Sequence, residues 1–163
     1  MNYADIKDVD IQDGIGVRTA LYVSGCTIHC KGCHNKVAWD FNYGLTFDEA
    51  AKNRIFNNLS NSYIEGLSIL GGEPMHPKNI EGTTKLAKAF KEKFPNKNLW
   101  AWSGFLFDQD LKDKEVLNYL DTLVDGQYVD ELRDPTLKWK GSSNQRVINV
   151  QESLRSNNLV LVD

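Results

Sequence analysis

The three cysteines of this chain lie close together, as Cys26, Cys30 and Cys33 in the spacing C-x3-C-x2-C. They are the only cysteines among its 163 residues. Three thiols cannot all pair as disulfides, but three thiolates can hold three irons of a 4Fe-4S cluster and leave the fourth iron open. The spacing therefore favours an iron–sulfur site at which chemistry takes place.

A zinc site is the main alternative for these cysteines, with His29 or His34 as the fourth ligand. Structural zinc sites usually take their ligands as two separated pairs, and the sequence has no second pair. A disulfide with one free thiol is disfavoured further, because no signal-like apolar segment indicates an oxidising compartment. On spacing alone, the iron–sulfur site and the zinc site both remain open.

Length and charge limit the class of protein. A chain of this size, with 41% hydrophobic and 25% charged residues, predicts one globular domain over residues 1–163. The formal net charge of −3 argues against a general nucleic-acid or membrane-surface binder, and the apolar runs are too short to span a bilayer. We therefore expect a cytoplasmic protein with no nucleic-acid or membrane partner.

Strand-like and helical segments alternate along the chain, which is typical of an α/β protein with a mainly parallel sheet. Strands are expected over residues 17–24, 67–70, 99–102 and 123–125, with further strand near 146–150 and 159–162. Helices are expected after a capping box of Thr46 and Glu49, over residues 79–94 and near 114–120.

Loops of unusual composition follow four of these strands: Gly25-Cys26, Gly71-Gly72-Glu73-Pro74, Ser103-Gly104 and Asp125-Gly126. Parallel strands joined in right-handed succession bring their carboxyl ends to one edge, so we expect these loops to form one pocket. A complete eight-stranded barrel needs about 250 residues. The expected fold is therefore a partial β/α barrel, with an open sheet and helices on the outside.

These motifs together resemble the radical S-adenosylmethionine enzymes, in particular the activating proteins of anaerobic (class III) ribonucleotide reductase. The cysteine loop led by Gly25 and the Gly-Gly-Glu-Pro loop match the family pattern. Residues 13–18 (Asp-Gly-Ile-Gly-Val-Arg) are similar to the segment before the cluster strand in glycyl-radical activases, and Cys33-His34-Asn35 with Trp39-Asp40 resembles activases of pyruvate formate-lyase. Residues 139–145 resemble a late segment of the reductase activases, whereas Gly32 stands where the superfamily often has an aromatic residue.

The resemblance implies one 4Fe-4S cluster held by Cys26, Cys30 and Cys33, with S-adenosylmethionine bound at the open iron. It also implies cleavage of that cofactor to a 5'-deoxyadenosyl radical, which takes a hydrogen atom from a glycine Cα of the large reductase subunit. No side chain is expected to act as a catalytic group, because the cofactors carry the chemistry. The implied electron donor is a low-potential flavodoxin or ferredoxin.

The residues expected to contact S-adenosylmethionine are His34, Asn35, Gly71, Gly72, Glu73, Pro74, Ser103 and Asp125. The two glycines let the backbone approach the ammonium group of the ligand. Glu73 has three possible roles: contact with that ammonium, bracing of its loop, or exposure to solvent. Ser103 and Asp125 are also common helix caps, so a purely structural role stays open for both.

Several other residues have two alternative roles. Arg18 either pairs with a carboxylate or lies on an exposed face, and His29 and His34 are expected to pack or form hydrogen bonds rather than ligate metal. Trp39, Trp100 and Trp102 are expected in the core or the pocket wall. Residues 138–146 either dock the partner or cap the sheet.

Two other functions remain open at this point. One is a different radical enzyme on the same scaffold, either an activase of another glycyl-radical enzyme or a small synthase of the 7-carboxy-7-deazaguanine type. The other is a zinc-stapled interaction module without catalysis. The segment at residues 139–145 and the lack of any inserted second cluster favour the reductase activase.

Overall fold

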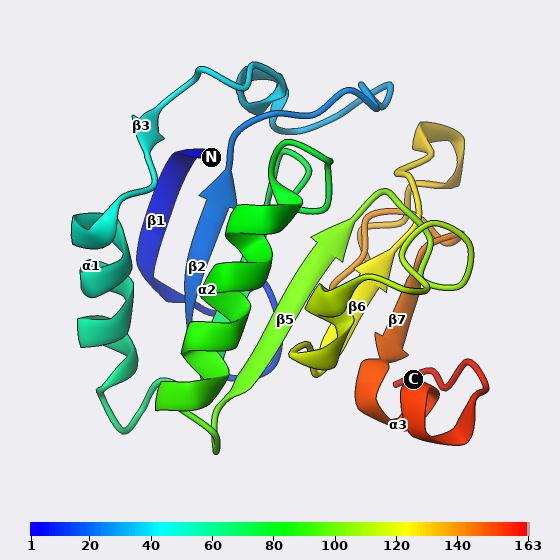
Figure 1. Ribbon diagram of the computed structural model, residues 1–163. Coiled ribbons are helices and arrows are strands. Elements are labelled where there is room, and N and C mark those ends of the chain that lie inside the picture. Colours follow the sequence, from blue (N-terminus) through cyan, green and yellow to red (C-terminus); the bar gives the residue numbers. More distant parts are fainter. Residues whose placement is uncertain (163) are drawn as a thin grey trace.

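A computed structural model describes residues 1–162, which form a seven-stranded sheet with helices packed against it (Figure 1). The strands are β1 (Asn2–Asp10), β2 (Arg18–Val23), β3 (Leu45–Thr46), β4 (Gly66–Gly71), β5 (Asn98–Ser103), β6 (Thr122–Asp125) and β7 (Arg146–Asn149). The α-helices are α1 (Glu49–Leu59), α2 (Ile80–Lys93) and α3 (Val150–Ser156). Short 3-10 helices are η1 (Lys36–Trp39), η2 (Glu115–Asn118) and η3 (Asp130–Leu132).

The sheet has the strand order β3-β1-β2-β4-β5-β6-β7. Its four central strands, β2, β4, β5 and β6, are parallel, whereas the pairs β1–β2, β1–β3 and β6–β7 are antiparallel. The expected α/β fold with a mainly parallel, open sheet is confirmed. The carboxyl ends of the four parallel strands meet at one edge, where the loops of interest begin.

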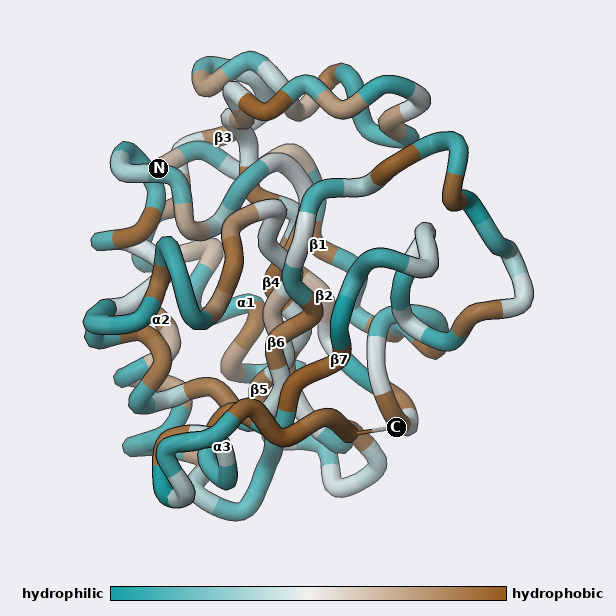
Figure 2. Tube along the Cα trace, turned by 90° about the vertical axis from the view of Figure 1, so that its right-hand side faces the viewer, coloured by the Kyte–Doolittle hydropathy of each residue, from teal (hydrophilic) through white to brown (hydrophobic). Residues whose placement is uncertain are grey.

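The two faces of the sheet are packed differently. The face covered by helices carries the main core, in which Leu21, Leu67, Ile69 and Leu99 are fully buried. In Figure 2, α2 and α3 lie to one side of the strands, and hydrophobic residues concentrate along the strands. The opposite face carries a smaller cluster of Trp100, Val124 and Val147, with Trp102 and Trp139 packed against it. This second face leaves room for a cavity beside the strand ends.

Some sequence predictions of the secondary structure are wrong. Helix α1 is capped by Asp48, whose carboxylate accepts the backbone N–H of Ala51 at 2.9 Å, and the expected cap Thr46 pairs in β3 instead. The helix expected near residues 114–120 is only the 3-10 turn η2. Residues 159–162 contribute a single bridge, between Leu161 and Ile148, and β1 and α3 were not predicted.

Within residues 1–162, Arg18 is neither exposed nor paired with a carboxylate, so both sequence hypotheses for it are wrong. Its side chain is fully buried, and its guanidinium donates to Ser68 Oγ at 2.7 Å and Asn98 Oδ1 at 2.6 Å. The guanidinium also lies over the ring of Trp100, 5.4 Å from its centre. Burial lowers the pKa of Arg18 to about 10, and neutral acceptors replace the water that it loses.

Within residues 1–162, no helix has the length and apolar character needed to cross a membrane.

Candidate functional site

The loops that follow the four parallel strands surround one cavity of about 420 Å³. Its first wall is the cysteine loop, defined here as residues 25–40, and its floor is formed by Gly71, Gly72, Glu73, Ser103 and Gly104. The opposite wall comes from Tyr128, from residues 139–141 and from Gln145. In Figure 1 the cysteine loop lies above the upper end of β2, and the chain after β6 rises at the upper right.

The two ends of the cysteine loop are hydrogen-bonded to each other. The N–H of Gly25 donates to the carbonyl of Ala38 at 2.7 Å, and the N–H of Cys26 donates to the carbonyl of Trp39 at 3.1 Å. Gly25 has a φ of 104°, and a Cβ there would lie 2.0 Å from the ring of Phe41. Only glycine therefore fits this position, where β2 turns into the loop.

The three thiols line the cavity, are partly exposed and form no disulfide. Burial raises the pKa of Cys26 and Cys30, so both are thiols at neutral pH until a metal displaces their protons. Within residues 1–162 no three His, Cys, Asp or Glu side chains converge on the position of a single metal ion. A cubane cluster does not need such convergence, because each thiolate binds a different iron. Three thiols that line one cavity are therefore a donor set that fits such a cluster.

The two histidines of the loop are occupied with aromatic neighbours. His29 stacks on Trp39, with ring centres 4.1 Å apart and planes at 14°, and His34 lies 6.0 Å from the ring of Tyr128. His34 and Asn35 line the cavity, as do Trp39 and Trp102. These rings pack around the site, which is the packing role expected for His29 and His34.

The Gly-Gly-Glu-Pro loop lies directly against the cysteine loop. Gly72 donates to the carbonyl of Val23 at 2.8 Å, and Glu73 donates to that of Gly25 at 2.7 Å. A Cβ on Gly72 would lie 2.6 Å from the carbonyl oxygen of Gly25 and 2.7 Å from that of Ala38. The glycine is thus required by the contact between the two loops, which is a different reason from the ligand approach expected from the sequence.

Glu73 is buried, with 1% of its surface exposed, and it braces the floor. Its Oε1 accepts from the N–H of Gly104 at 2.6 Å and its Oε2 from that of Met75 at 2.9 Å. The hydroxyl of Ser103 donates to the same carboxylate, at 2.9 Å from Oε2. Burial raises the pKa of Glu73 to about 7, because the three hydrogen bonds offset only part of the lost hydration. Of the three roles considered for Glu73, solvent exposure is excluded.

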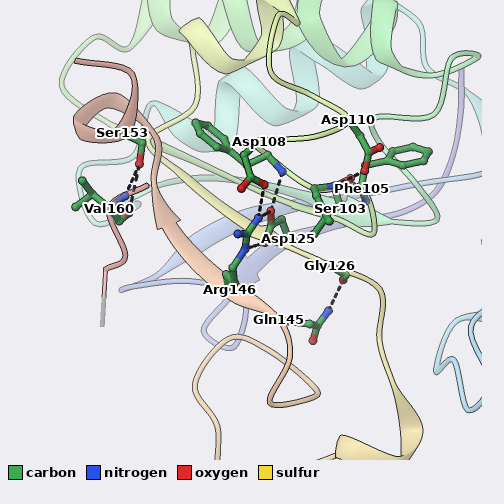
Figure 3. Close-up of polar contacts among 12 residues, drawn as sticks. Ser103, Phe105, Asp108, Asp110, Asp125, Gly126, Gln145, Arg146, Ser153 and Val160 are labelled. Carbon is green, nitrogen blue, oxygen red and sulfur yellow. Dashed lines mark hydrogen bonds and ion pairs between the residues drawn. The ribbon is translucent and has the colours of Figure 1, made fainter. Parts of the chain in front are cut away.

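Asp125 is not among the residues that line the cavity, and its expected contact with the cofactor stays a prediction. It is fully buried, and Arg146 donates to its two oxygens, at 2.9 Å from Nε and 2.6 Å from Nη2. The same Arg146 reaches Asp108 at 2.9 Å, as Figure 3 shows. The N–H of Phe107 also donates to Oδ2 of Asp125, at 2.8 Å. The Asp125 carboxylate therefore links β6 to β7 and to the loop after β5 through hydrogen bonds.

Pro74 is buried just behind the floor, where its carbonyl accepts from Thr83 at 2.9 Å. It does not line the cavity either. Ser103, by contrast, lines the cavity and accepts from the N–H of Phe105 at 3.0 Å while it donates to Glu73. Ser103 is therefore at the cavity, as expected, and its bond to Phe105 lies in a loop rather than at the start of a helix.

The wall at residues 139–145 is held together by its own polar side chains. Gln145 accepts from the N–H groups of Gly141 at 2.8 Å and Ser142 at 3.1 Å, and it donates to the carbonyl of Gly126 at 3.0 Å (Figure 3). The carbonyl of Trp139 accepts from the indole N–H of Trp102 at 2.7 Å. The segment therefore forms a fixed wall, and its Gln side chain serves internal bonding.

The sequence of the chain has clear relatives among known proteins. Residues 12–148 match the family model described as a 4Fe-4S single cluster domain. The anaerobic ribonucleoside-triphosphate reductase-activating protein of Escherichia coli K12 is 41% identical over 150 residues, which cover 90% of this chain and 97% of that protein. The chain belongs to this family of activating proteins.

Two further relatives carry the same name. The activating protein of Haemophilus influenzae is 40% identical over 148 residues, covering 89% of this chain and 96% of that protein. The activating protein of Enterobacteria phage T4 is 40% identical over 148 residues, covering 90% and 93%. The recognition made from the cysteine and glycine motifs is confirmed, and the family model supports an iron–sulfur cluster rather than zinc.

Asp13, Tyr22 and Asn79 belong to this activating-protein site but were not identified as site residues from the sequence. Asp13 lines the cavity, and the hydroxyl of Tyr22 donates to its carboxylate at 2.6 Å, while burial raises the pKa of Asp13 to about 6. Asn79 is buried and donates to the carbonyls of Ser24 at 3.0 Å and Glu73 at 3.1 Å, joining both loops. Asp13-Gly14 lies in the segment that resembles glycyl-radical activases, so the sequence did offer a signal for Asp13. Nothing local distinguishes Asn79 from an ordinary residue before a helix.

Proposed function

We propose that this protein activates anaerobic ribonucleoside-triphosphate reductase in the cytoplasm as a radical S-adenosylmethionine activase, with residues 1–163 acting as one partial-barrel domain. The observation that carries the proposal is the cavity in which three thiols face a glycine-rich floor with a buried carboxylate. The name shared by the relatives supports the large reductase subunit as partner, and the family model supports the 4Fe-4S cluster.

Cys26, Cys30 and Cys33 would hold the cluster through three of its irons. When bound, the cluster and S-adenosylmethionine supply a one-electron cleavage of the C5'–S bond, giving methionine and a 5'-deoxyadenosyl radical that takes a hydrogen atom from a glycine Cα of the reductase. A low-potential flavodoxin or ferredoxin is proposed as the source of the electron.

The floor residues would receive S-adenosylmethionine, together with His34 and Asn35 at the cysteine loop. Gly71 and Gly72 expose backbone at the cavity, and Glu73 presents a buried carboxylate without a cationic partner among the hydrogen bonds described above. An ammonium group placed there would lower the pKa of Glu73 and favour its ionised form. Ser103 would act by orienting this carboxylate, and Pro74 by supporting the loop from behind.

Water must be kept away from a radical that reacts with most C–H bonds. Trp39, Trp102 and Trp139 contribute apolar surface to the cavity, and the sheet is open between β3 and β7 rather than closed into a barrel. An open edge admits a segment of a protein substrate, and the bound segment itself would complete the exclusion of water. Residues 138–146 are the proposed docking segment.

An anaerobic assay tests this function. The reconstituted protein is incubated with dithionite and S-adenosylmethionine, with and without an anaerobic reductase, and 5'-deoxyadenosine and the electron paramagnetic resonance spectrum are recorded. We expect deoxyadenosine together with a glycyl-radical doublet on the reductase. Deoxyadenosine without the doublet would reassign the substrate to another activase or synthase reaction, and neither signal from a fully loaded cluster would overturn the proposal.

A further inference from the structure

Two buried side-chain polar atoms lack a hydrogen-bond partner within residues 1–162, and they stand at the two ends of the cysteine loop. They are Ser24 Oγ, directly before Gly25, and Trp39 Nε1, at the end of η1. Buried polar groups in folded proteins rarely remain unpaired, because the lost hydration is not replaced. A donor left unpaired at a cavity wall therefore indicates an acceptor that the polypeptide does not itself provide.

Trp39 is the better placed of the two for contact with such a group. It lines the cavity together with the three thiols, whereas Ser24 does not. Its carbonyl accepts from the N–H of Cys26 at 3.1 Å, and its ring is stacked on His29. The indole is thus held beside the first of the expected cluster ligands.

An unpaired indole N–H is not a general property of the tryptophans at this site. Trp102 lines the same cavity, but its indole N–H donates to the carbonyl of Trp139 at 2.7 Å. An indole N–H can only donate, so Trp39 needs an acceptor. The sulfurs of a cluster bound by Cys26 and its neighbours are acceptors that would reach this side of the cavity.

We propose that Trp39 Nε1 donates a hydrogen bond to a sulfur of the bound 4Fe-4S cluster and thereby raises the reduction potential of that cluster. The inference rests on the proposed cluster, but not on the identity of the reductase. A donor stabilises the additional negative charge of the reduced state, and hydrogen bonds to sulfur are among the determinants of cluster potential. Trp39 is therefore a tuning residue, neither a ligand nor a catalytic residue.

The test compares Trp39→Phe with the matched variant Trp102→Phe in the reconstituted protein without S-adenosylmethionine. Each change removes one indole N–H from the cavity lining, but only Trp39 lacks a protein acceptor. We expect Trp39→Phe to shift the cluster potential to a more negative value and Trp102→Phe to shift it less. Equal shifts in the two variants, or no shift in Trp39→Phe, would overturn the inference.

A second measurement does not depend on a variant that loads its cluster. Pulsed electron–nuclear double resonance of the reduced wild-type protein, prepared in H2O and in D2O, detects exchangeable protons close to the cluster. We expect an exchangeable proton with the coupling of an N–H···S hydrogen bond that disappears when the indole nitrogen is replaced through benzothiophene-alanine labelling of the tryptophans. Persistence of that signal after replacement would assign the proton to a group other than an indole and contradict the inference. A colourless protein without iron would instead refute the proposed cluster.

Discussion

The cysteine loop and the floor of the same cavity are held by different means. The floor is held by hydrogen bonds within the protein, since the Glu73 carboxylate accepts from Met75, Ser103 and Gly104. The cysteine loop carries partly exposed thiols and is bordered by two unpaired buried polar atoms. We infer that folding alone completes the floor, whereas the cysteine loop reaches its final arrangement only with the cluster bound. Binding energy of the cluster then orders the loop against a surface that already exists.

The largest expected effect follows from removing one thiol. Cys30→Ala should abolish the visible absorption of the cluster and the cleavage of S-adenosylmethionine, because two thiolates cannot retain the cubane. The stability of the apoprotein should change by less than about 0.5 kcal/mol, since this side chain is small and partly exposed. Urea unfolding and anaerobic turnover measure the two effects. The control is Thr27→Ala, at an exposed position of the same loop, which should retain the visible absorption and the cleavage of S-adenosylmethionine. Cofactor cleavage by Cys30→Ala would contradict the ligand assignment.

A change in the floor, unlike the loss of a thiol, should lower the stability of the apoprotein. Glu73→Ala leaves the N–H groups of Met75 and Gly104 without their acceptor, so we expect the apoprotein to lose about 3 kcal/mol of unfolding free energy. Glu92→Ala, at an exposed position of α2, should have almost no effect in the same urea titration. A Glu73→Ala apoprotein as stable as the wild type would show that the floor is not completed by folding.

The contact between the two regions depends on Gly72. A methyl group there would meet the backbone oxygens of Gly25 and Ala38, so Gly72→Ala should cost about 2 kcal/mol and reduce cluster loading as well. Gly82→Ala is the matched control, because its methyl group would meet only the flexible side chain of Met1 and helix α2 favours alanine. Thermal unfolding and iron content are measured for both variants. Equal stability and equal iron content in the two would contradict the proposed steric clash at Gly72.

A further expected effect concerns pH. The folded-state pKa of Glu73 is raised to about 7 from 4.5, so between these values the folded protein binds more protons than the unfolded chain. Glu73 therefore lowers stability as the pH rises through this window, and its effect is complete above about pH 7. Asp13, with its pKa raised to about 6, acts in the same direction.

Urea unfolding of the apoprotein at pH 5 and pH 8 measures this dependence. The loss of stability between the two pH values should be smaller in Glu73→Gln than in the wild type, because the amide does not titrate. An identical loss in both proteins would mean that Glu73 has an ordinary pKa and is better hydrated than its burial indicates.

The parallel strands and their terminal loops were predictable because their signals are local. Short apolar runs marked β4, β5 and β6, and the glycines and polar residues after them marked the edge where the cavity lies. Strand β1 has no such signal, since only Ile6 and Asp10 are buried along its nine residues. The expected capping box at Thr46 failed because pairing with β1 used that residue, leaving Asp48 as the cap.

The side-chain partners within the site were not predictable, because they depend on pairings far apart in the sequence. Asp125 was expected at the cofactor, but it faces Arg146 across the antiparallel β6–β7 pair. The order of the strands after residue 126 was not evident from the sequence, so neither was this ion pair. Asn79 likewise joins the two loops only because α2 begins beside them.

Hydrogen–deuterium exchange of the apoprotein and of the cluster-loaded protein tests the contrast between the two regions most directly. We predict that the amides of Glu73, Met75 and Gly104 are protected in both forms, while amides of residues 27–32 become protected only when the cluster is bound. Rapid exchange of the floor amides in the apoprotein, or a cysteine loop already protected without the cluster, would contradict this account.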